Sequence, residues 1–242
     1  MELEISLAPQ ILTRFMGFPV TNTLLMSGAV SCFLIALAFF FARTKKFVPG
    51  RFQAALEFVF EGLLALADGV TGNRKRTMRF APIAFTIFFF VLFANLIEII
   101  PGVESLGIEM EGHRVPILRS PSTDLNTTLA LALIAVVSAQ LWGIAALGPL
   151  KHIGKYFSLR GPIDFFVGML EAVSEVAKVV SFSFRLFGNI FAGSVLLIVV
   201  SALLPAIVPI PFLGLEIFVG FVQALVFSVL ALVFMTMATE SH

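Results

Sequence analysis

Five apolar segments, each long enough to cross a lipid bilayer, constrain the fold of this chain more than any other feature. A membrane-spanning helix needs about 20 mostly apolar residues. The chain has 242 residues, of which 59% are hydrophobic, and its mean hydropathy is +1.02. Soluble domains contain only roughly 45–50% apolar residues. We therefore predict an all-α integral membrane protein with about five crossings, built as a single membrane domain over residues 1–242.

Polar and turn-forming residues mark the ends of these segments. We expect crossings at residues 24–42, 80–100, 124–147, 162–204 and 212–237, and one further helix at 52–69. The helix at 52–69 carries three acidic residues among leucines and phenylalanines, which is typical of an amphipathic helix in the membrane interface.

The last two segments predict a long hairpin with a turn at Leu204–Pro205. Residues 162–204 would form a helix of about 64 Å at 1.5 Å per residue. The hydrocarbon core of a bilayer is only about 30 Å thick. We therefore predict that the two helices of the hairpin are strongly tilted.

Basic residues predict the orientation of the chain. Of the 16 Lys and Arg residues, 11 lie at positions 43–51, 72–79 and 151–160. The positive-inside rule puts these segments in the cytoplasm, the N-terminus outside and the C-terminus inside. The acidic N-terminus lacks the basic start of a signal peptide, so we expect the first segment to be retained as a span.

Several function classes are disfavoured by the sequence. A net charge of +1 argues against nucleic-acid binding as the main role. There is no phosphate-binding G-x-x-x-x-G-K-[ST] loop and no metal-ligand spacing, and we expect no cofactor. The single cysteine, Cys32, lies in an apolar run, where a thiol is more often inert than redox-active.

One arginine stands inside an apolar segment. Arg185 is always charged, and a charge at the bilayer centre costs at least about 2.5–3.5 kcal/mol. Glu171, Lys178 and Arg185 are seven residues apart, and Asn189 follows one turn later, so helical spacing predicts one polar stripe. Glu171 lies about 21 Å from Arg185 along the axis. A partner for Arg185 must therefore come from another helix or another protein; the alternative is a structural buried ion pair.

The segment from Ser181 to Gly193, SFSFRLFGNIFAG, resembles the signature of the a subunit of F-type ATP synthases. The resemblance extends to the span that ends in Asn95-Leu-Ile-Glu-Ile-Ile-Pro101 and to the segment that begins at Pro121-Ser-Thr-Asp124. It implies a non-catalytic stator subunit that couples proton flow to rotation and ATP synthesis. The implied location is a bacterial inner membrane, with a periplasmic N-terminus and a cytoplasmic C-terminus.

The same resemblance implies the partners of the chain. They are a rotating ring of c subunits, peripheral-stalk subunits of the b type and, indirectly, the F1 ATPase head, all assembled at a lipid bilayer.

The hairpin register predicts two polar layers. If the turn centres near Leu204–Pro205, residues whose numbers sum to about 409 face each other, so Arg185 faces Gln223 and Ser194 faces Glu216. The resemblance implies a glutamine opposite the arginine and a polar or ionisable pair in the second layer. Serine at 194 leaves Glu216 as the only titratable group of that layer, which puts a two-residue relay in doubt.

The resemblance also implies roles for these residues. Arg185 would separate two offset proton pathways. Glu216, Asn189, Gln223 and Ser194 would belong to the outer pathway, and Glu171 and Glu175 to the inner one, with Lys178 nearby.

Simpler interpretations stand beside these roles. Glu216 and Gln223 would also fit ordinary hydrogen bonds between helices. Glu171 and Glu175 would fit a solvated helix start, and Lys178 a side chain that extends to the membrane surface.

Three other polar residues have simple structural interpretations as well. Asp124 would fit a helix cap, and His113 and His152 loop histidines. As protein classes, a secondary transporter predicts inverted repeats, which the sequence lacks, and a scaffold would not need Arg185 and Glu216 within the membrane.

Overall fold

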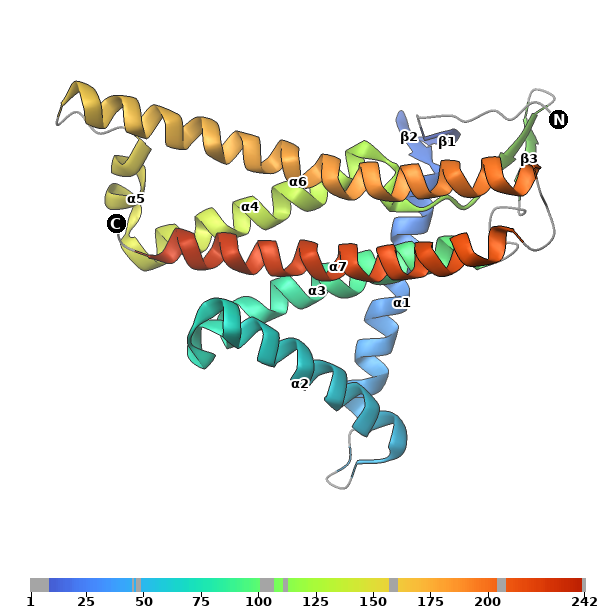
Figure 1. The fold of residues 1–242 in the computed structure, drawn as a ribbon, viewed down its shortest axis with the longest axis horizontal. Helices are drawn as coiled ribbons and strands as arrows, with labels where there is room; N and C mark the ends of the chain where they lie inside the picture. Colours follow the sequence, from blue (N-terminus) through green and yellow to red (C-terminus); the bar gives the residue numbers. More distant parts are fainter. Residues whose placement is uncertain are drawn as a thin grey trace. The chain divides into compact units, whose positions relative to one another are not determined.

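The computed structural model describes residues 9–44, 46, 49–100, 107–110, 113–156, 161–203 and 208–240, and most of these are helical. The helices are α1 (Asn22–Thr44), α2 (Arg51–Thr71), α3 (Arg74–Glu98), α4 (Leu125–Leu147), α5 (Pro149–Tyr156), α6 (Pro162–Leu203) and α7 (Pro209–Thr239), with a 3-10 turn, η1 (Pro121–Thr123), before α4 (Figure 1). Five of them, α1, α3, α4, α6 and α7, are long and apolar enough to cross a membrane. The prediction of an all-α membrane protein with five crossings is confirmed.

Helix α2 is the additional amphipathic helix that the sequence predicted. Its buried residues, Leu63, Ala67 and Thr71, are spaced by four and so occupy one face. The helix ends at Gly72, whose φ of 66° is left-handed and whose N–H donates to the carbonyl of Asp68. A left-handed glycine is a common way to end a helix, because it lacks the steric penalty of a side chain.

Several boundaries differ from the predicted ones. Helix α3 begins at Arg74, six residues early, because the Asn73 side chain accepts a hydrogen bond from the Lys75 N–H at 2.8 Å and caps the helix. Helix α7 begins at Pro209, a residue that suits the first turn. The predicted turn at Leu204–Pro205 lies outside the described residues.

Two short antiparallel hairpins and helix α5 were not predicted. Strands β1 (Ile11–Phe15) and β2 (Phe18–Thr21) form the first hairpin, and β3 (Gly107–Met110) and β4 (His113–Pro116) form the second. Both turn residues of the first, Met16 and Gly17, have positive φ, which matches the right-handed twist of paired strands. The hairpins are too short to show the alternating pattern from which strands are predicted.

Contacts divide the chain into two compact units, and the first comprises residues 1–45, 88–128 and 184–225. Aromatic rings pack its helices together: Phe33 of α1 lies 5.2 Å from Phe93 of α3, and Phe88 of α3 lies 6.2 Å from Phe221 of α7, measured between ring centroids. A buried polar network joins α1 to the start of α4, where Thr23 Oγ1 donates to Asp124 Oδ2 at 2.9 Å.

The second unit comprises residues 46–87, 129–183 and 226–242. Phe182 of α6 stacks on Phe227 of α7 with centroids 3.6 Å apart and also contacts Phe234 edge-on. Ser228 Oγ of α7 donates to the Ala84 carbonyl of α3 at 2.9 Å. The single-domain prediction is not tested by this division and stays a prediction.

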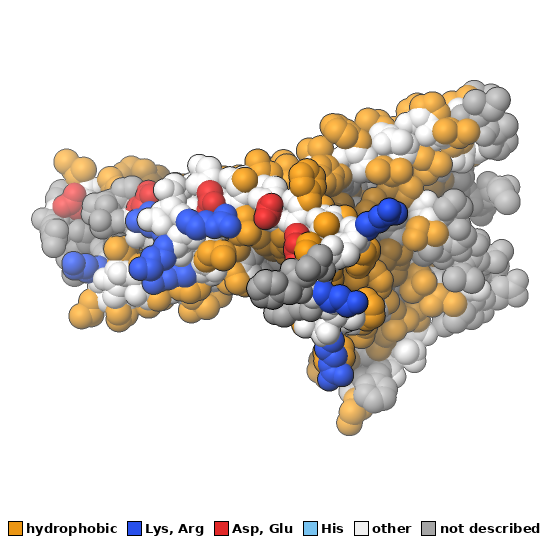
Figure 2. Space-filling model, turned by 90° about the horizontal axis from the view of Figure 1, so that it is seen from below, with side chains coloured by type: hydrophobic (Ala, Val, Ile, Leu, Met, Phe, Trp, Pro, Cys, Tyr) orange, Lys and Arg blue, Asp and Glu red, His pale blue; other side chains and the backbone are white. Residues whose placement is uncertain are grey.

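Large hydrophobic side chains remain exposed along the spanning helices. Figure 2 shows hydrophobic side chains over much of one face of the molecule. Phe39 and Phe40 of α1 are exposed, as are Val173 and Val176 of α6. Exposed apolar surface of this extent is expected of a protein whose surroundings are lipid or partner subunits.

Candidate functional site

Arg185 lies on the exposed side of α6. Leu186 and Ile190 of the same helix are 0% and 2% exposed and face the interior of the first unit, so helical geometry turns Arg185 away from it. Across the described residues, no carboxylate forms an ion pair with Arg185.

Asn189 and Gln223 join α6 to α7 next to Arg185. Asn189 Nδ2 donates to Gln223 Oε1 at 3.0 Å, and Gln223 is only 5% exposed. The register estimate had opposed Gln223 to Arg185; in the structure its amide oxygen instead accepts from Asn189, one helical turn further on. Gln223 Nε2 is buried and has no acceptor within the described part of the chain.

Glu216 is buried against α6. The carboxyl group lies beside Gly193, where an added Cβ would stand 3.3 Å from Glu216 Oε1, and the residue is 8% exposed. The glycine therefore makes room for the carboxyl group. The residue numbers of this pair sum to 409, as the hairpin register predicts. Ser194, next to Gly193, donates its hydroxyl to the Ile190 carbonyl at 3.0 Å.

A polar contact one turn along α7 was not singled out as a site from the sequence. Asn95 Nδ2 of α3 donates to the Gly220 carbonyl at 3.2 Å, and Ser122 Oγ donates to Asn95 Oδ1 at 2.6 Å. Asn95 is 2% exposed. Gly220 permits the approach, since a Cβ there would lie 3.1 Å from Asn95 Cβ. The sequence signals for this contact were an asparagine within an apolar segment and the resemblance of the span that ends in Asn95-Leu-Ile-Glu-Ile-Ile-Pro101.

Asp124 caps a helix, as the sequence predicted. Its Oδ1 accepts a hydrogen bond from the Asn126 N–H at 2.9 Å at the start of α4. Such a bond satisfies one of the unpaired N–H groups of a helix N-terminus. Asp124 is a buried helix cap that also binds Thr23.

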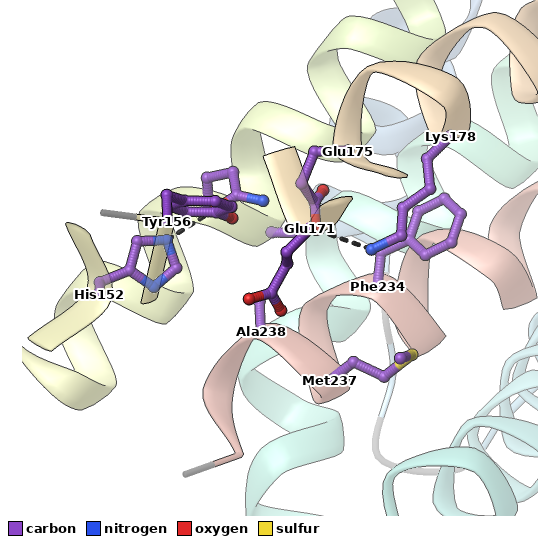
Figure 3. A pocket seen from close by; sticks show the side chains of 10 residues that line it. His152, Tyr156, Glu171, Glu175, Lys178, Phe234, Met237 and Ala238 are labelled. Carbon is purple, nitrogen blue, oxygen red and sulfur yellow. Dashed lines mark hydrogen bonds and ion pairs between the residues drawn. The ribbon is translucent and has the colours of Figure 1, made fainter. Parts of the chain in front are cut away.

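The second unit encloses a pocket of about 60 Å³ between α4, α5, α6 and α7 (Figure 3). Glu171, Glu175 and Lys178 of α6 all line it. Lys178 Nζ donates to Glu175 Oε1 at 2.7 Å and lies 5.6 Å from the centre of the Phe234 ring. Lys178 therefore forms an ion pair with Glu175 within the pocket.

The sequence analysis did not place three further residues in this pocket: Gln140, His152 and Tyr156. His152 was predicted to be a loop histidine; it is in fact a helical residue of α5 and is 5% exposed. Helix α5 forms because Gly148, with a φ of 85°, ends α4 and Pro149 suits a first helical turn. The spacing of four between His152 and Tyr156 was the available signal.

Tyr156 reports on the character of the pocket. Burial raises the pKa of its phenol, and the negative charge of Glu175 raises it further, while the hydrogen bond to Gln140 acts in the opposite direction. The pocket thus combines a poorly solvated wall with a negative potential from α6.

Comparison with known proteins agrees with the resemblance of the arginine motif. The family model described as ATP synthase A chain matches residues 23–236. The proteins named ATP synthase subunit a from Campylobacter jejuni and Gloeobacter violaceus are 34% and 37% identical over 221 and 223 residues. These matches cover 89% and 91% of this chain and 90% and 85% of the relatives. The subunit from Moorella thermoacetica is 29% identical over 224 residues, which is 93% of each chain. The chain therefore belongs to the ATP synthase subunit a family, as a multi-pass inner-membrane subunit of the Fo proton channel.

Proposed function

We propose that Arg185 is the residue that separates two offset proton pathways and that it works against a carboxylate carried by a rotating ring of c subunits. The observation that carries the proposal is an exposed arginine on a spanning helix with no carboxylate partner in the described part of this chain. A charge that faced lipid would cost at least about 2.5–3.5 kcal/mol, so a partner subunit must cover it.

The apolar face of α6 supports a protein partner at this surface. A shallow groove lined almost entirely by small and branched apolar side chains runs from Met169 to Ser181. Val180 of this groove is itself exposed. Such a surface would let an apolar ring slide past with the arginine as its main polar contact.

The chemistry follows from the effect of charge and solvation on a carboxylic acid. Close to the guanidinium of Arg185, the ring carboxyl group is favoured as the anion, because an opposite charge stabilises its charged form. Away from Arg185 and facing lipid, desolvation favours the neutral acid. Arg185 therefore causes proton release on one side and prevents an ion from passing straight across.

Glu216 is the proton-carrying group of the proposed outer pathway. Its buried position beside Gly193 supports this role. Asn189, Gln223 and Ser194 would line the same pathway, and the buried Gln223 Nε2 offers a donor to water or to an arriving carboxylate.

Glu171, Glu175 and Lys178 would line the inner pathway. Their shared pocket of about 60 Å³ supports this role, because a site needs only about 10–15 Å³ of such volume per water molecule. Basic residues support a cytoplasmic position for this end of the molecule, with a periplasmic N-terminus and a cytoplasmic C-terminus. The c-ring, b-type stalk subunits and, indirectly, the F1 head are the proposed partners.

Replacement of Arg185 tests the proposal. Arg185→Ala should abolish ATP synthesis and increase passive proton flux in inverted membrane vesicles, because no charge then separates the pathways. Arg185→Lys keeps the charge but loses the planar guanidinium, so it should fail to synthesise ATP and still hinder the leak. The amount of assembled complex is measured for each variant, and substantial coupled synthesis by Arg185→Ala would refute the role.

A further inference from the structure

A buried histidine lines the pocket. One of its two ring nitrogens forms no hydrogen bond with any of the described residues. His152 Nε2 lies 2.6 Å from Gln140 Oε1, whereas Nδ1 is buried without a hydrogen-bonding partner among those residues. The side chain as a whole is 5% exposed. Figure 3 shows its ring at the wall of the pocket, on the side of Tyr156.

The hydrogen bonds fix the tautomer of the ring. Gln140 Oε1 is an acceptor only, and Tyr156 Oη donates to the same oxygen at 3.0 Å. His152 Nε2 must therefore carry a hydrogen, which leaves the lone pair of neutral His152 on Nδ1. Gln140 and Tyr156 hold the ring in one orientation with one nitrogen able to accept a proton.

The charged groups that line the pocket come from α6. Helix α6 contributes the carboxylates of Glu171 and Glu175 and the ammonium of Lys178, which together carry one net negative charge. Helix α5 contributes Tyr156, and the described lining residues of α4 and α7 carry no charge. An imidazolium at His152 would balance the net charge of the pocket.

We propose that His152 is a proton-holding group of the inner pathway, with Gln140 and Tyr156 as its positioning residues. Nδ1 packs against Gly143 of α4, so a hydronium ion from the pocket reaches it only when α4 and α5 separate slightly. It then transfers its proton to Nδ1; an O–H bond breaks, an N–H bond forms and water remains. Release of the proton to water reverses the step and restores the neutral ring. The hydrogen on Nε2 remains there throughout, hydrogen-bonded to Gln140. This inference rests on the proposed inner pathway of Glu171 and Glu175.

The first test is passive proton flux through the complex, stripped of its F1 head, in inverted vesicles. The pH of the cytoplasmic side is varied between about 5 and 8, the range in which histidine side chains change charge. We expect His152→Gln to lower the flux severalfold and to remove the inflection that the unmodified complex shows in this range. Lys151→Gln, an exposed neighbour on α5, removes one positive charge and should leave the inflection unchanged.

The positioning role has its own readout. Tyr156→Phe keeps the aromatic ring but removes the donor to Gln140, so the inflection should remain and shift in pH. A structural role for Tyr156 would change the amount of complex without moving the inflection.

A direct titration decides the question even where His152→Gln fails to assemble. The chain contains three histidines, so replacing His113 and His242 leaves His152 alone. This chain, labelled with ¹⁵N-histidine and assembled with unlabelled partners in vesicles, should show the Nε2–H tautomer at high pH and imidazolium at low pH. A neutral ring throughout that range, or an unchanged flux inflection in His152→Gln, would overturn the inference. The role proposed for Arg185 is tested separately by Arg185→Ala, so either proposal can fail without the other.

Discussion

The approach of α5 and α7 to α4 at Gly143 provides a sensitive test of the packing around the pocket. A Cβ at Gly143 would lie 2.6 Å from His152 Cε1 and 2.7 Å from the Ala238 carbonyl oxygen. Favourable contacts between carbon atoms require about 3.5–4.0 Å. Gly143→Ala must therefore displace the His152 ring and also the backbone of α7, which cannot rotate away as a side chain can.

Gly154 supplies a matched control within α5, because a Cβ at that position would have nothing within 4 Å. Replacing a helical glycine with alanine gains about 0.8–1 kcal/mol in helix propensity at either site. Overpacking at Gly143 costs about 1–3 kcal/mol. Gly143→Ala should therefore be less stable than Gly154→Ala by about 1–3 kcal/mol.

Thermal unfolding of the solubilised complex measures this difference. A change of 1 kcal/mol corresponds to about 2–4 °C in Tm for a chain of this size, and Gly143→Ala should melt at the lower temperature. Its proton flux should also show a displaced pH inflection if His152 moves. Equal melting temperatures for the two variants would refute the close packing of α5 and α7 on α4.

Three further predictions concern other parts of the molecule. Glu216→Gln should slow proton conduction, and unchanged flux would make Glu216 structural. Asn95→Leu should lower the stability of the complex by about 1–3 kcal/mol, the usual cost of a buried polar group left without its partner, because Ser122 Oγ loses its acceptor; an unchanged Tm would contradict this. With Cys32 replaced, an impermeant thiol reagent on intact cells should label a cysteine at position 107 but not one at position 75, and the reverse pattern would overturn the proposed orientation.

The spanning helices could be predicted because length and hydropathy alone define them. The pairing of α6 with α7 at Glu216 was also accessible, since the hairpin register gave the sum of residue numbers that Gly193 and Glu216 show. The same register opposed Gln223 to Arg185, whereas the amide binds Asn189. A register predicts only which residues lie at the same height along two paired helices. Whether Gln223 contacts Arg185 or Asn189, one turn apart, also depends on the rotation of each helix about its own axis.

The pocket could be predicted only in part, because its residues come from segments far apart in the sequence. Glu171 and Lys178 were expected to share a stripe with Arg185, but an α-helix drifts by about 20° for every seven residues. The drift helps to explain why Glu171 and Lys178 line a pocket while Arg185 is exposed. His152 was missed because its burial depends on a contact with Gln140 of another helix, which no local pattern encodes.

The exposure of Arg185 bears on what the functional unit is. The interior of the first unit is satisfied without it: Leu186 and Ile190 fill the inward face of α6, and the side-chain bond from Asn189 to Gln223 joins α6 to α7. Removing the guanidinium should therefore leave the fold of this chain largely intact. In the proposed assembly, its desolvation cost of at least about 2.5–3.5 kcal/mol would be offset by the carboxylate of the ring. We therefore expect Arg185→Ala to keep its fold but to lose the coupling of proton flow to ATP synthesis. This result would show that Arg185 acts in coupling and is not needed for the stability of the chain.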